Sequence, residues 1–325
     1  YLLVGPPGTG KTSMAMRFMV EEHLASTAAP EGNILLTSYT NRAVDEICGM
    51  IDDAGIDYLR VGNEYTCAEV FRPHLASRLF AEMGNMSSIR RYISEVRVVV
   101  ATTSTLMSHQ EILTLKRFSL TIVDEASQIL EPSIIGLLSR LGKFILIGDT
   151  KQLPAVVQQS EADSLVTEPE LRKIGLTDCR RSLFERLASL ATSAAPCGIL
   201  RRQGRMHPLI ASWPGAAFYK EERLLPVPLP HQEETRLAYS EPSADDIDDV
   251  LKSHRVLFFD VERDGIAGDV KSNTSEARAV ADIIVRLRRQ VGRAWDSRKT
   301  LGVIVPYRNQ ISLIRREITR LGAAD

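Results

Sequence analysis

The sequence predicts an α/β fold whose first half is a doubly wound parallel sheet, and two observations carry this prediction. Short apolar runs without polar alternation recur along residues 1–150, separated by stretches with helical periodicity. This rhythm is typical of strands that are buried on both faces of a parallel sheet. The first apolar run also breaks into a Gly-rich loop that leads directly into a helical stretch, which is the strand–loop–helix order of such folds.

Strands are predicted over Leu2–Val4, Ile34–Ser38, Val96–Ala101, Leu120–Asp124 and Phe144–Gly148. Helices are predicted over Ser13–Leu24, Ala43–Ile51 and Pro132–Leu141. Polar residues follow every one of these strands, and the carboxyl ends of parallel strands meet at one edge of a sheet. We therefore expect the Gly-rich loop and four other polar clusters (38–41, 102–103, 124–125 and 149–152) to converge on one ligand site.

A second rhythm begins near residues 195–198, which read as a hinge because they combine Pro196 with Gly198. The predicted domains are therefore 1–194 and 195–325. Predicted elements of the second domain are strands at Val256–Val261 and Leu301–Val305, helices at Ser275–Gln290 and Asn309–Leu321, and a loop over 224–249. Two strands are too few to form a full sheet, so we expect the second domain to be truncated. Because the chain also starts inside a strand, we expect it to be part of a longer protein.

Composition excludes several classes of protein. The 325 residues are 44% hydrophobic and 25% charged, which is ordinary for a globular chain with a full core. The net charge of −1 gives no general attraction to nucleic acid, so such binding would depend on local patches. No apolar run is long enough for a membrane span, and the four widely spaced cysteines predict free thiols in a reducing compartment. We expect an intracellular protein, cytoplasmic or nuclear, with no membrane partner.

The Gly-rich loop Gly5–Thr12 fits the spacing G-x-x-x-x-G-K-[ST] of a phosphate-binding P-loop. Its glycines allow backbone N–H groups to surround phosphate oxygens, and the following helix adds its positive end. A Gly/Pro-rich surface turn would not need Lys-Thr at this spacing. We predict that ATP is bound through Gly8, Thr9, Gly10, Lys11 and Thr12, with Lys11 at the β- and γ-phosphates and Thr12 on Mg²⁺.

Two carboxylates, Asp124 and Glu125, end the fourth predicted strand. An acid in this place of a P-loop ATPase holds Mg²⁺, and a second acid beside it can orient and deprotonate the attacking water. We assign Asp124 to the metal and Glu125 to the general base. The alternative is that Asp124 caps the next helix and Glu125 is a solvated neighbour.

Gln152 follows the next strand and has two readings from the residues alone. Its amide can hydrogen-bond the γ-phosphate or the attacking water. Alternatively, Asp149 and Pro154 form an ordinary β-turn in which Gln152 has no chemical role. The residues leave both readings open.

Seven motifs occur in a characteristic order along the chain. They are Gly5–Thr12, residues 38–45 (SYTNRAVD), 124–128 (DEASQ), 148–154 (GDTKQLP), 203–208 (QGRMHP), 273–277 (NTSEA) and 305–310 (VPYRNQ). The set resembles the superfamily 1B helicases, the group that contains the nonsense-mediated-decay RNA helicase and the nuclease-helicase that processes Okazaki-fragment flaps. Residues 37–41 are closer to the latter branch.

The resemblance implies a P-loop motor with two RecA-like domains, the second truncated here, that uses ATP and Mg²⁺. Gln152 would contact the γ-phosphate, and Arg205 would be an arginine finger delivered from the second domain. Nucleic acid would contact Ser38, Thr40, Asn41, Thr102 and Thr103. Short hydroxyls and an amide suit phosphate oxygens, although Thr40 or Asn41 could instead cap a helix.

Two departures from the family pattern have consequences. The family usually has an aromatic residue before the finger arginine, and here the position is Gly204, so we expect weaker discrimination in favour of adenine. The chain also stops before the family's last two motifs. We therefore expect the isolated chain to bind nucleotide but to hydrolyse it and unwind strands poorly.

The sequence thus predicts a nucleic-acid-dependent ATPase, a helicase or translocase moving 5′-to-3′ on single strands, with DNA slightly favoured over RNA. Its partners are single-stranded DNA or RNA and possible domains or proteins outside the given chain. The rival hypothesis is an ATP-gated nucleic-acid clamp or signalling switch that does not unwind processively. A P-loop kinase of a small metabolite is disfavoured by the second α/β unit and by the distance of Arg205 along the chain.

Overall fold

The computed structural model describes residues 1–28, 31–190, 196–235, 239–262 and 271–322. Its contacts divide the chain into two compact units, the first made of 1–206 with 214–228, and the second of 207–213 with 229–325. This division differs from the predicted boundary between 194 and 195. Residues 197–199, which overlap the predicted hinge, pair as a strand with the sheet of the first unit. The predicted domain boundary stays a prediction.

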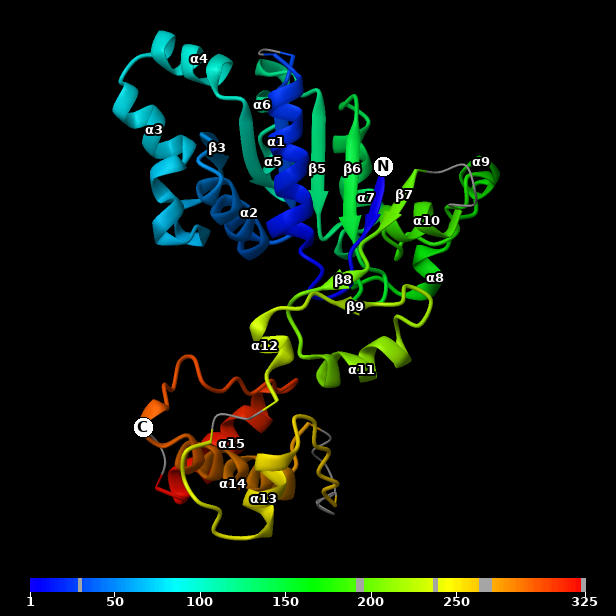
Figure 1. Cartoon of the computed structure of the whole chain (residues 1–325). Coiled ribbons are helices and arrows are strands. Elements are labelled where there is room, and N and C mark those ends of the chain that lie inside the picture. The colour runs from blue at the N-terminus through cyan, green and yellow to red at the C-terminus, as the bar shows by residue number, and fades with distance from the viewer. Residues whose placement is uncertain (29–30, 191–195, 236–238, 263–270, 323–325) are drawn as a thin grey trace. The chain divides into compact units, whose positions relative to one another are not determined.

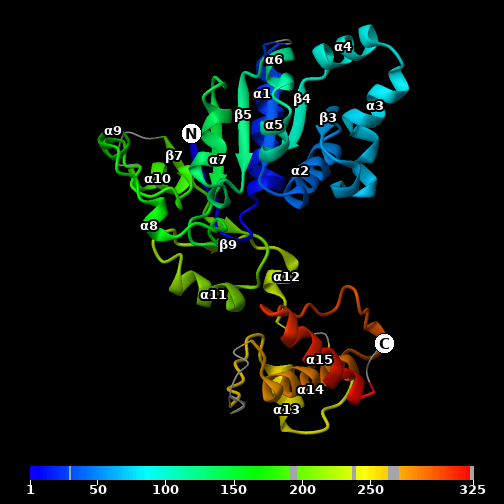
Figure 2. The same ribbon diagram turned by 180° about the vertical axis from the view of Figure 1, so that it is seen from behind.

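The first unit is built on a seven-stranded sheet with the order β3-β4-β2-β5-β6-β1-β7, in which every neighbouring pair is parallel. The strands are β1 (Leu2–Val4), β2 (Ile34–Ser38), β3 (Tyr58–Val61), β4 (Val98–Thr102), β5 (Leu120–Asp124), β6 (Phe144–Gly148) and β7 (Cys197–Ile199). All five predicted strands are confirmed, with β4 starting two residues later than predicted. Figures 1 and 2 show this sheet from its two faces.

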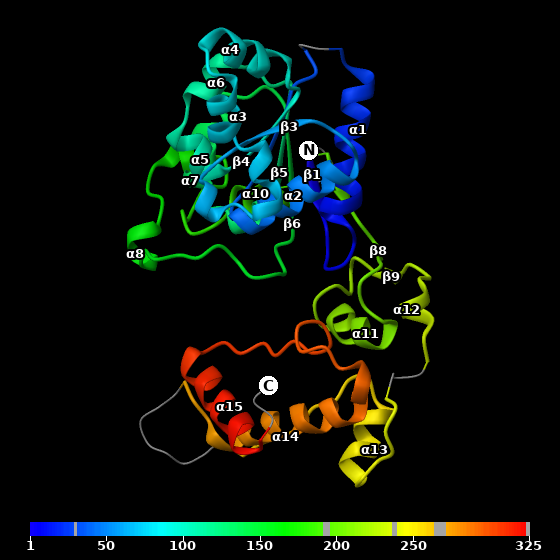
Figure 3. The same cartoon turned by 90° about the vertical axis from the view of Figure 1, so that its left-hand side faces the viewer.

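Helices cover both faces of the sheet. They are the π-helical turn η1 (Lys11–Met16), α1 (Arg17–Ser26), α2 (Asn41–Asp53), α3 (Ala76–Met83), α4 (Met86–Glu95), α5 (Thr103–Ser108), α6 (Glu111–Leu115), α7 (Glu131–Leu138), α8 (Glu161–Ser164), α9 (Pro169–Lys173) and α10 (Leu183–Leu190), with short 3₁₀ turns η2 (Glu64–Thr66), η3 (Glu69–His74) and η4 (Ala126–Gln128). Figure 3 shows α1 on one side of the strands and α5 and α7 on the other. This is the doubly wound α/β arrangement that the apolar runs predicted.

Alternate residues of each strand supply the two halves of the core. In β2, Ile34 and Leu36 pack with Val20 of α1 and Ile47 of α2 on one face. Leu35, between them in sequence, packs on the other face with residues of α5 and α7. Because successive strand side chains point to opposite faces, an uninterrupted apolar strand is what a two-faced core requires.

The remaining elements follow β7. The first unit also contains β8 (Arg202–Gln203), which pairs in parallel with β9 (Leu225–Pro226). The other helices are α11 (Pro208–Ala217), α12 (Pro230–Glu233), α13 (Asp246–Ser253), α14 (Thr274–Val291) and α15 (Arg308–Arg320), with the 3₁₀ turn η5 (Gly292–Ala294). The predicted helices in the second half are confirmed by α14 and α15, and the predicted loop over 224–249 is only partly right, since it contains β9, α12 and the start of α13.

The strands predicted in the second unit are not formed. Residues 256–261 and 301–305 form no strand, and the described part of this unit holds no sheet. Phe258 is 91% exposed and Ile304 98% exposed, so these apolar segments have no neighbouring strand to bury them. The strand prediction was therefore wrong for this chain, because an apolar run becomes a buried strand only when other strands flank it.

Among the described residues, no helix has both the length and the apolar character needed to cross a bilayer. All four cysteines are free thiols, as predicted, with Cys48 and Cys67 buried.

Candidate nucleotide-binding site

The loop Gly5–Thr12 joins β1 to the helical turn η1 at the carboxyl edge of the sheet. Gly10 precedes the first helical residue and has φ 74°, and Gly8 has φ 75°, both in the left-handed region that favours glycine. The N–H of Gly5 donates to the carbonyl of Gly148 in β6 at 3.0 Å, which fixes the start of the loop to the sheet. The loop therefore ends at the positive end of a helix, as phosphate binding requires.

Gly8 has a second reason to be glycine. A Cβ added there would lie 2.6 Å from the Cβ of Arg205 and 3.3 Å from its backbone nitrogen. The carbonyl of Gly8 also accepts a hydrogen bond from the N–H of Gly204 at 2.9 Å. The absence of a side chain thus allows the segment that carries Arg205 to lie directly against the P-loop.

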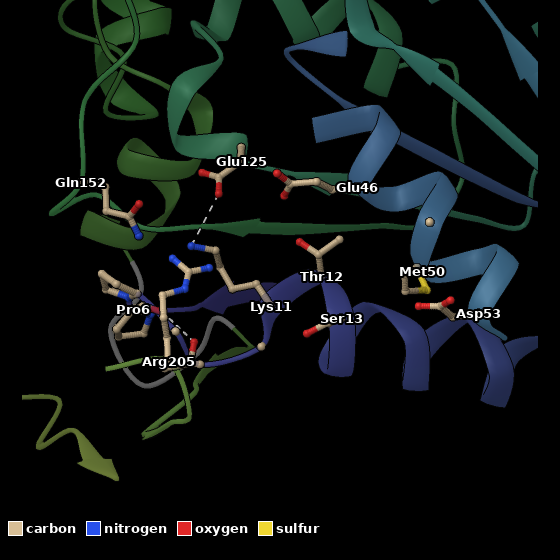
Figure 4. A pocket seen from close by; sticks show the side chains of 15 residues that line it. Pro6, Lys11, Thr12, Ser13, Glu46, Met50, Asp53, Glu125, Gln152 and Arg205 are labelled. Carbon is tan, nitrogen blue, oxygen red and sulfur yellow. Dashed lines mark hydrogen bonds and ion pairs between the residues drawn. The ribbon is translucent and has the colours of Figure 1, made fainter. Parts of the chain in front are cut away.

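A cavity of about 440 Å³ opens over this loop. It is lined by Pro6, Pro7, Gly8, Thr9, Gly10, Lys11, Thr12 and Ser13 of the loop and helix start, by Glu46, Gly49, Met50 and Asp53 of α2, and by Glu125, Gln152 and Arg205. Figure 4 shows the Lys11 amine between Glu125 above and Arg205 below. Segments that are far apart in the sequence thus contribute charged groups to one pocket.

Asp124 and Thr12 form the pair expected for a cation. The Thr12 hydroxyl donates to Oδ2 of Asp124 at 2.6 Å, and Asp124 is only 2% exposed. Burial raises the pKa of Asp124 to about 6, while the bond from Thr12 opposes the rise. Oxygen ligands of this kind suit Mg²⁺, whose charge would favour the ionised carboxylate. The described residues contain no group of three His, Cys, Asp or Glu side chains placed for a metal.

The capping alternative for Asp124 is not what the structure has. Its Oδ1 accepts from the backbone N–H of Glu125 at 3.0 Å, and its other oxygen is bonded to Thr12. Glu125 itself has φ 50°, an uncommon conformation for a residue with a side chain. Its Oε1 lies 3.6 Å from Nζ of Lys11, and its Oε2 accepts from Nε2 of Gln128 at 3.1 Å. The strained backbone thus directs a carboxylate toward the P-loop lysine.

The structure shows the turn of the second reading of Gln152, and the contact with the γ-phosphate or the attacking water stays a prediction. The segment is a turn, because the N–H of Gln152 donates to the carbonyl of Asp149 at 3.3 Å. The side chain of Gln152 nevertheless lines the pocket, and its Nε2 donates to Oδ2 of Asp149 at 2.8 Å. The turn therefore places the Gln152 side chain at the wall of the pocket.

Arg205 belongs to the first unit rather than the second. Oε1 of the buried Gln203 accepts from the backbone N–H of Arg205 at 3.1 Å and from that of Met206 at 2.8 Å. This division differs from the expectation that a separate domain delivers Arg205. β7 pairs with β1 in the sheet, and the N–H of Gly204 donates to the carbonyl of Gly8 in the P-loop.

Comparison with known proteins supports the interpretation of this pocket as a nucleotide-binding site. Two family models, each described as an AAA domain, match residues 1–88 and 80–160, and residues 179–324. The DNA replication ATP-dependent helicase/nuclease JHS1 of Arabidopsis thaliana is 32% identical over 98% of this chain. The DNA replication ATP-dependent helicase/nuclease DNA2 of Mus musculus is 30% identical over 98% of it.

The chain belongs to the superfamily 1B helicases. It spans 22% of the Arabidopsis relative and 29% of the mouse relative. The structure of an arterivirus helicase, nonstructural protein 10, aligns with 70% of this chain and with 41% of the viral chain, at 16% sequence identity. The TM-score of 0.42 is too low to support a conclusion.

The nucleic-acid candidates of this superfamily 1B chain lie at the same edge of the sheet. Ser38 and Thr102 are paired in register between β2 and β4, and Thr103 begins α5. All three are buried, and the Ser38 hydroxyl donates to the carbonyl of Asp124 at 3.1 Å. Thr40 is exposed and caps α2 by accepting from the N–H of Ala43 at 3.1 Å, which is the capping alternative left open by the sequence.

Sequence reasoning missed two residues that touch the helicase motifs. The Ser127 hydroxyl accepts from the N–H of Asp149 at 3.1 Å and so joins the loops after β5 and β6. The Tyr219 hydroxyl donates to Oδ2 of Asp149 at 2.7 Å, although 70 positions separate the two residues. Ser127 lies inside a quoted motif and could have been considered, but no spacing rule indicates Tyr219.

Proposed function

We propose that this chain is the ATP-hydrolysing motor region of a nucleic-acid helicase or translocase that moves 5′-to-3′ on single strands and slightly prefers DNA to RNA. One observation carries the proposal: Lys11, Glu125, Gln152 and Arg205 line a single pocket over a P-loop. The names of the Arabidopsis and mouse relatives, which refer to ATP-dependent helicase/nucleases of DNA replication, support the choice of DNA and an intracellular location.

The P-loop residues Gly8, Thr9, Gly10, Lys11 and Thr12 would hold the triphosphate. Mg²⁺ on Thr12 and Asp124 would supply positive charge beside the β- and γ-phosphates. The Lys11 amine would contact the γ-phosphate, for which it must separate from Glu125. Their Nζ–Oε1 distance is 3.6 Å, so nucleotide binding would have to replace this ion pair.

Hydrolysis requires a water in line with the γ-phosphate. Glu125 would accept a proton from this water, and the Gln152 amide would orient the water or a γ-phosphate oxygen. The Arg205 guanidinium and the Lys11 amine would stabilise the negative charge that develops on the phosphate oxygens. Each side chain thus has a distinct role in one displacement reaction.

Single-stranded nucleic acid would cross the edge of the sheet at Thr40 and Asn41, where short polar groups suit phosphate oxygens. Ser38, Thr102 and Thr103 are proposed to support this surface, since their buried hydroxyls can reach a phosphate only if the edge opens. The assignment of residues 1–194 and 195–325 to two RecA-like motor domains remains part of this proposal.

The decisive experiment measures ATP hydrolysis with and without single-stranded DNA or RNA, in the original chain and in Glu125→Gln. Single-turnover conditions allow slow hydrolysis to be measured. We expect stimulation by the single strand and a loss of about 10²–10⁴-fold in rate in Glu125→Gln, with nucleotide binding retained. Glu22→Gln, an exposed residue of α1, is the matched control and should behave as the original chain.

Two results would count against the motor. If single strands bind in an ATP-dependent way but never change the hydrolysis rate, the chain is a clamp or switch. If Glu125→Gln hydrolyses ATP at the original rate, the general base is another group and the assignment of Glu125 is wrong.

A further inference from the structure

A buried network connects the Gln152 turn to a segment far along the chain. Oδ2 of Asp149 accepts two hydrogen bonds, from the Tyr219 hydroxyl at 2.7 Å and from Nε2 of Gln152 at 2.8 Å. Asp149 is 1% exposed and Tyr219 3% exposed. One carboxylate oxygen is thus shared between a buried tyrosine and the amide that faces the nucleotide pocket.

The same segment makes a second contact with the turn. Three residues after Tyr219, Oε1 of Glu222 pairs with Nζ of Lys151 at 2.6 Å. This amine also lies 5.6 Å from the centroid of the Tyr219 ring. Residues 219–222 therefore contact two residues of the turn that carries Gln152, namely Asp149 through Tyr219 and Lys151 through Glu222.

The segment is tied to the strand before Arg205 as well. The N–H of Leu225 donates to the carbonyl of Arg201 at 2.8 Å, and the N–H of Val227 donates to that of Gln203 at 2.9 Å. These are bonds of the β8–β9 pair, and Gln203 in turn fixes the backbone of Arg205. Residues 219–227 thus join the two side chains proposed to act on the γ-phosphate.

We propose that Tyr219 is a positioning residue. It fixes the orientation of the Gln152 amide through Asp149 and so keeps the position of this amide constant relative to Arg205. The inference deepens the proposed function and rests on it. The terminal amide torsion of glutamine is broad, so Gln152 needs an external partner to hold one orientation. A phenylalanine would fill the same volume as Tyr219, which makes the hydroxyl the part that matters to Asp149.

The state of the hydroxyl is consistent with this role. Burial, and then the bond to Asp149, raises the pKa of Tyr219 well above its usual range. The group therefore stays protonated and remains a donor to the carboxylate. A carboxylate that accepts from both partners leaves the carbonyl oxygen of the Gln152 amide to face the pocket.

The test compares Tyr219→Phe, Gln152→Ala and the double variant by single-turnover ATP hydrolysis, with enzyme in excess and at a saturating concentration. Affinity for mant-ATP is measured in parallel, and rates are normalised to the fraction of protein that binds it, so that partial unfolding does not imitate the effect. We expect Tyr219→Phe to lower the rate about tenfold with affinity unchanged. In the Gln152→Ala background, Tyr219→Phe should lower the rate no further.

Tyr58→Phe is the matched control. Tyr58 is fully buried in β3 at the edge of the sheet, stacked on His74 with ring centroids 4.1 Å apart. Loss of its hydroxyl should leave the rate unchanged.

The outcomes separate the inference from the proposed function. If Gln152→Ala slows hydrolysis but Tyr219→Phe does not, or if their effects multiply, Tyr219 has no positioning role while the proposed function stands. If Gln152→Ala itself hydrolyses at the original rate, the proposed role of Gln152 and the inference fall together.

Discussion

The two units each contain a pocket of about 440 Å³, and comparing them shows what makes a phosphate site. The second pocket is lined by Lys271, Ser272, Asn273, Glu276, Val280, Val303, Ile304, Val305, Pro306, Tyr307, Gln310 and Ile314. Both pockets thus hold a lysine, a hydroxyl and a glutamate. Only the first places its lysine and a hydroxyl on a loop with two glycines of positive φ, which leads into a helix at the carboxyl edge of a parallel sheet.

The polar groups of the second pocket mostly satisfy one another. Nε2 of Gln310 donates to the carbonyl of Asn273 at 3.0 Å and to Oε2 of Glu276 at 3.2 Å, and Oε1 of Gln310 accepts from the N–H of Asn273 at 2.8 Å. These bonds join the starts of α14 and α15. We therefore expect backbone geometry, more than residue type, to decide where a triphosphate binds.

The largest expected effect tests this difference directly. Lys11→Ala should lower the rate of ATP hydrolysis by about 10²–10³-fold, since it removes a fixed positive charge from the developing phosphate charge. Lys271→Ala should leave both hydrolysis and mant-nucleotide affinity unchanged. Single-turnover hydrolysis and fluorescence titration give the two readouts. Equal losses in the two variants would contradict the assignment of nucleotide binding to the first pocket alone.

The second expected effect concerns apolar residues that have the same sequence pattern in the two units. Ile122 is fully buried in β5, whereas Ile304 is 98% exposed in a segment that forms no strand. Ile122→Ala should lower the free energy of unfolding by about 3–4 kcal/mol, because it leaves a cavity between strand and helices. Ile304→Ala should change it by less than about 0.5 kcal/mol.

Urea unfolding of both variants measures the difference. A large loss of stability from Ile304→Ala would mean that residues 301–305 are buried in the folded chain. The predicted strand at this place would then have a partner.

The same contrast explains how much of the fold the sequence could predict. Each apolar run of the first half became a strand because its neighbours in the sheet are also strands. β3 was missed because Arg60 interrupts its apolar character, yet Arg60 is buried and ion-paired with Asp45. β7 was missed because Gly198 and the preceding proline indicate a hinge. Strand order and such pairings depend on distant residues, which local patterns do not contain.

The candidate site was predictable to a similar extent. The P-loop spacing identified Lys11 and Thr12, and the position of two carboxylates at a strand end identified Asp124 and Glu125. Both motifs could be recognised because each lies within one short stretch of sequence. The position of Arg205 against Gly8 and the bond from Tyr219 to Asp149 required the folded chain. Short-range chemistry was therefore readable in the sequence, whereas the contacts that orient it were not.

Helix caps give the smallest expected effect, and here the two units should behave alike. The Thr40 side chain accepts from the N–H of Ala43 at the start of α2, and the Asn273 side chain accepts from the N–H of Glu276 at the start of α14. Thr40→Ala and Asn273→Ala should each cost about 1 kcal/mol of unfolding free energy. Thr40→Ser and Asn273→Asp, which keep an acceptor oxygen, should cost little. Thermal and urea unfolding measure all four variants.

A cap needs only four consecutive residues, so its contribution should be independent of whether a sheet surrounds it. If Asn273→Ala has no effect while Thr40→Ala does, α14 depends on something other than its own N-terminus, and the similarity of the two units ends even at this local level.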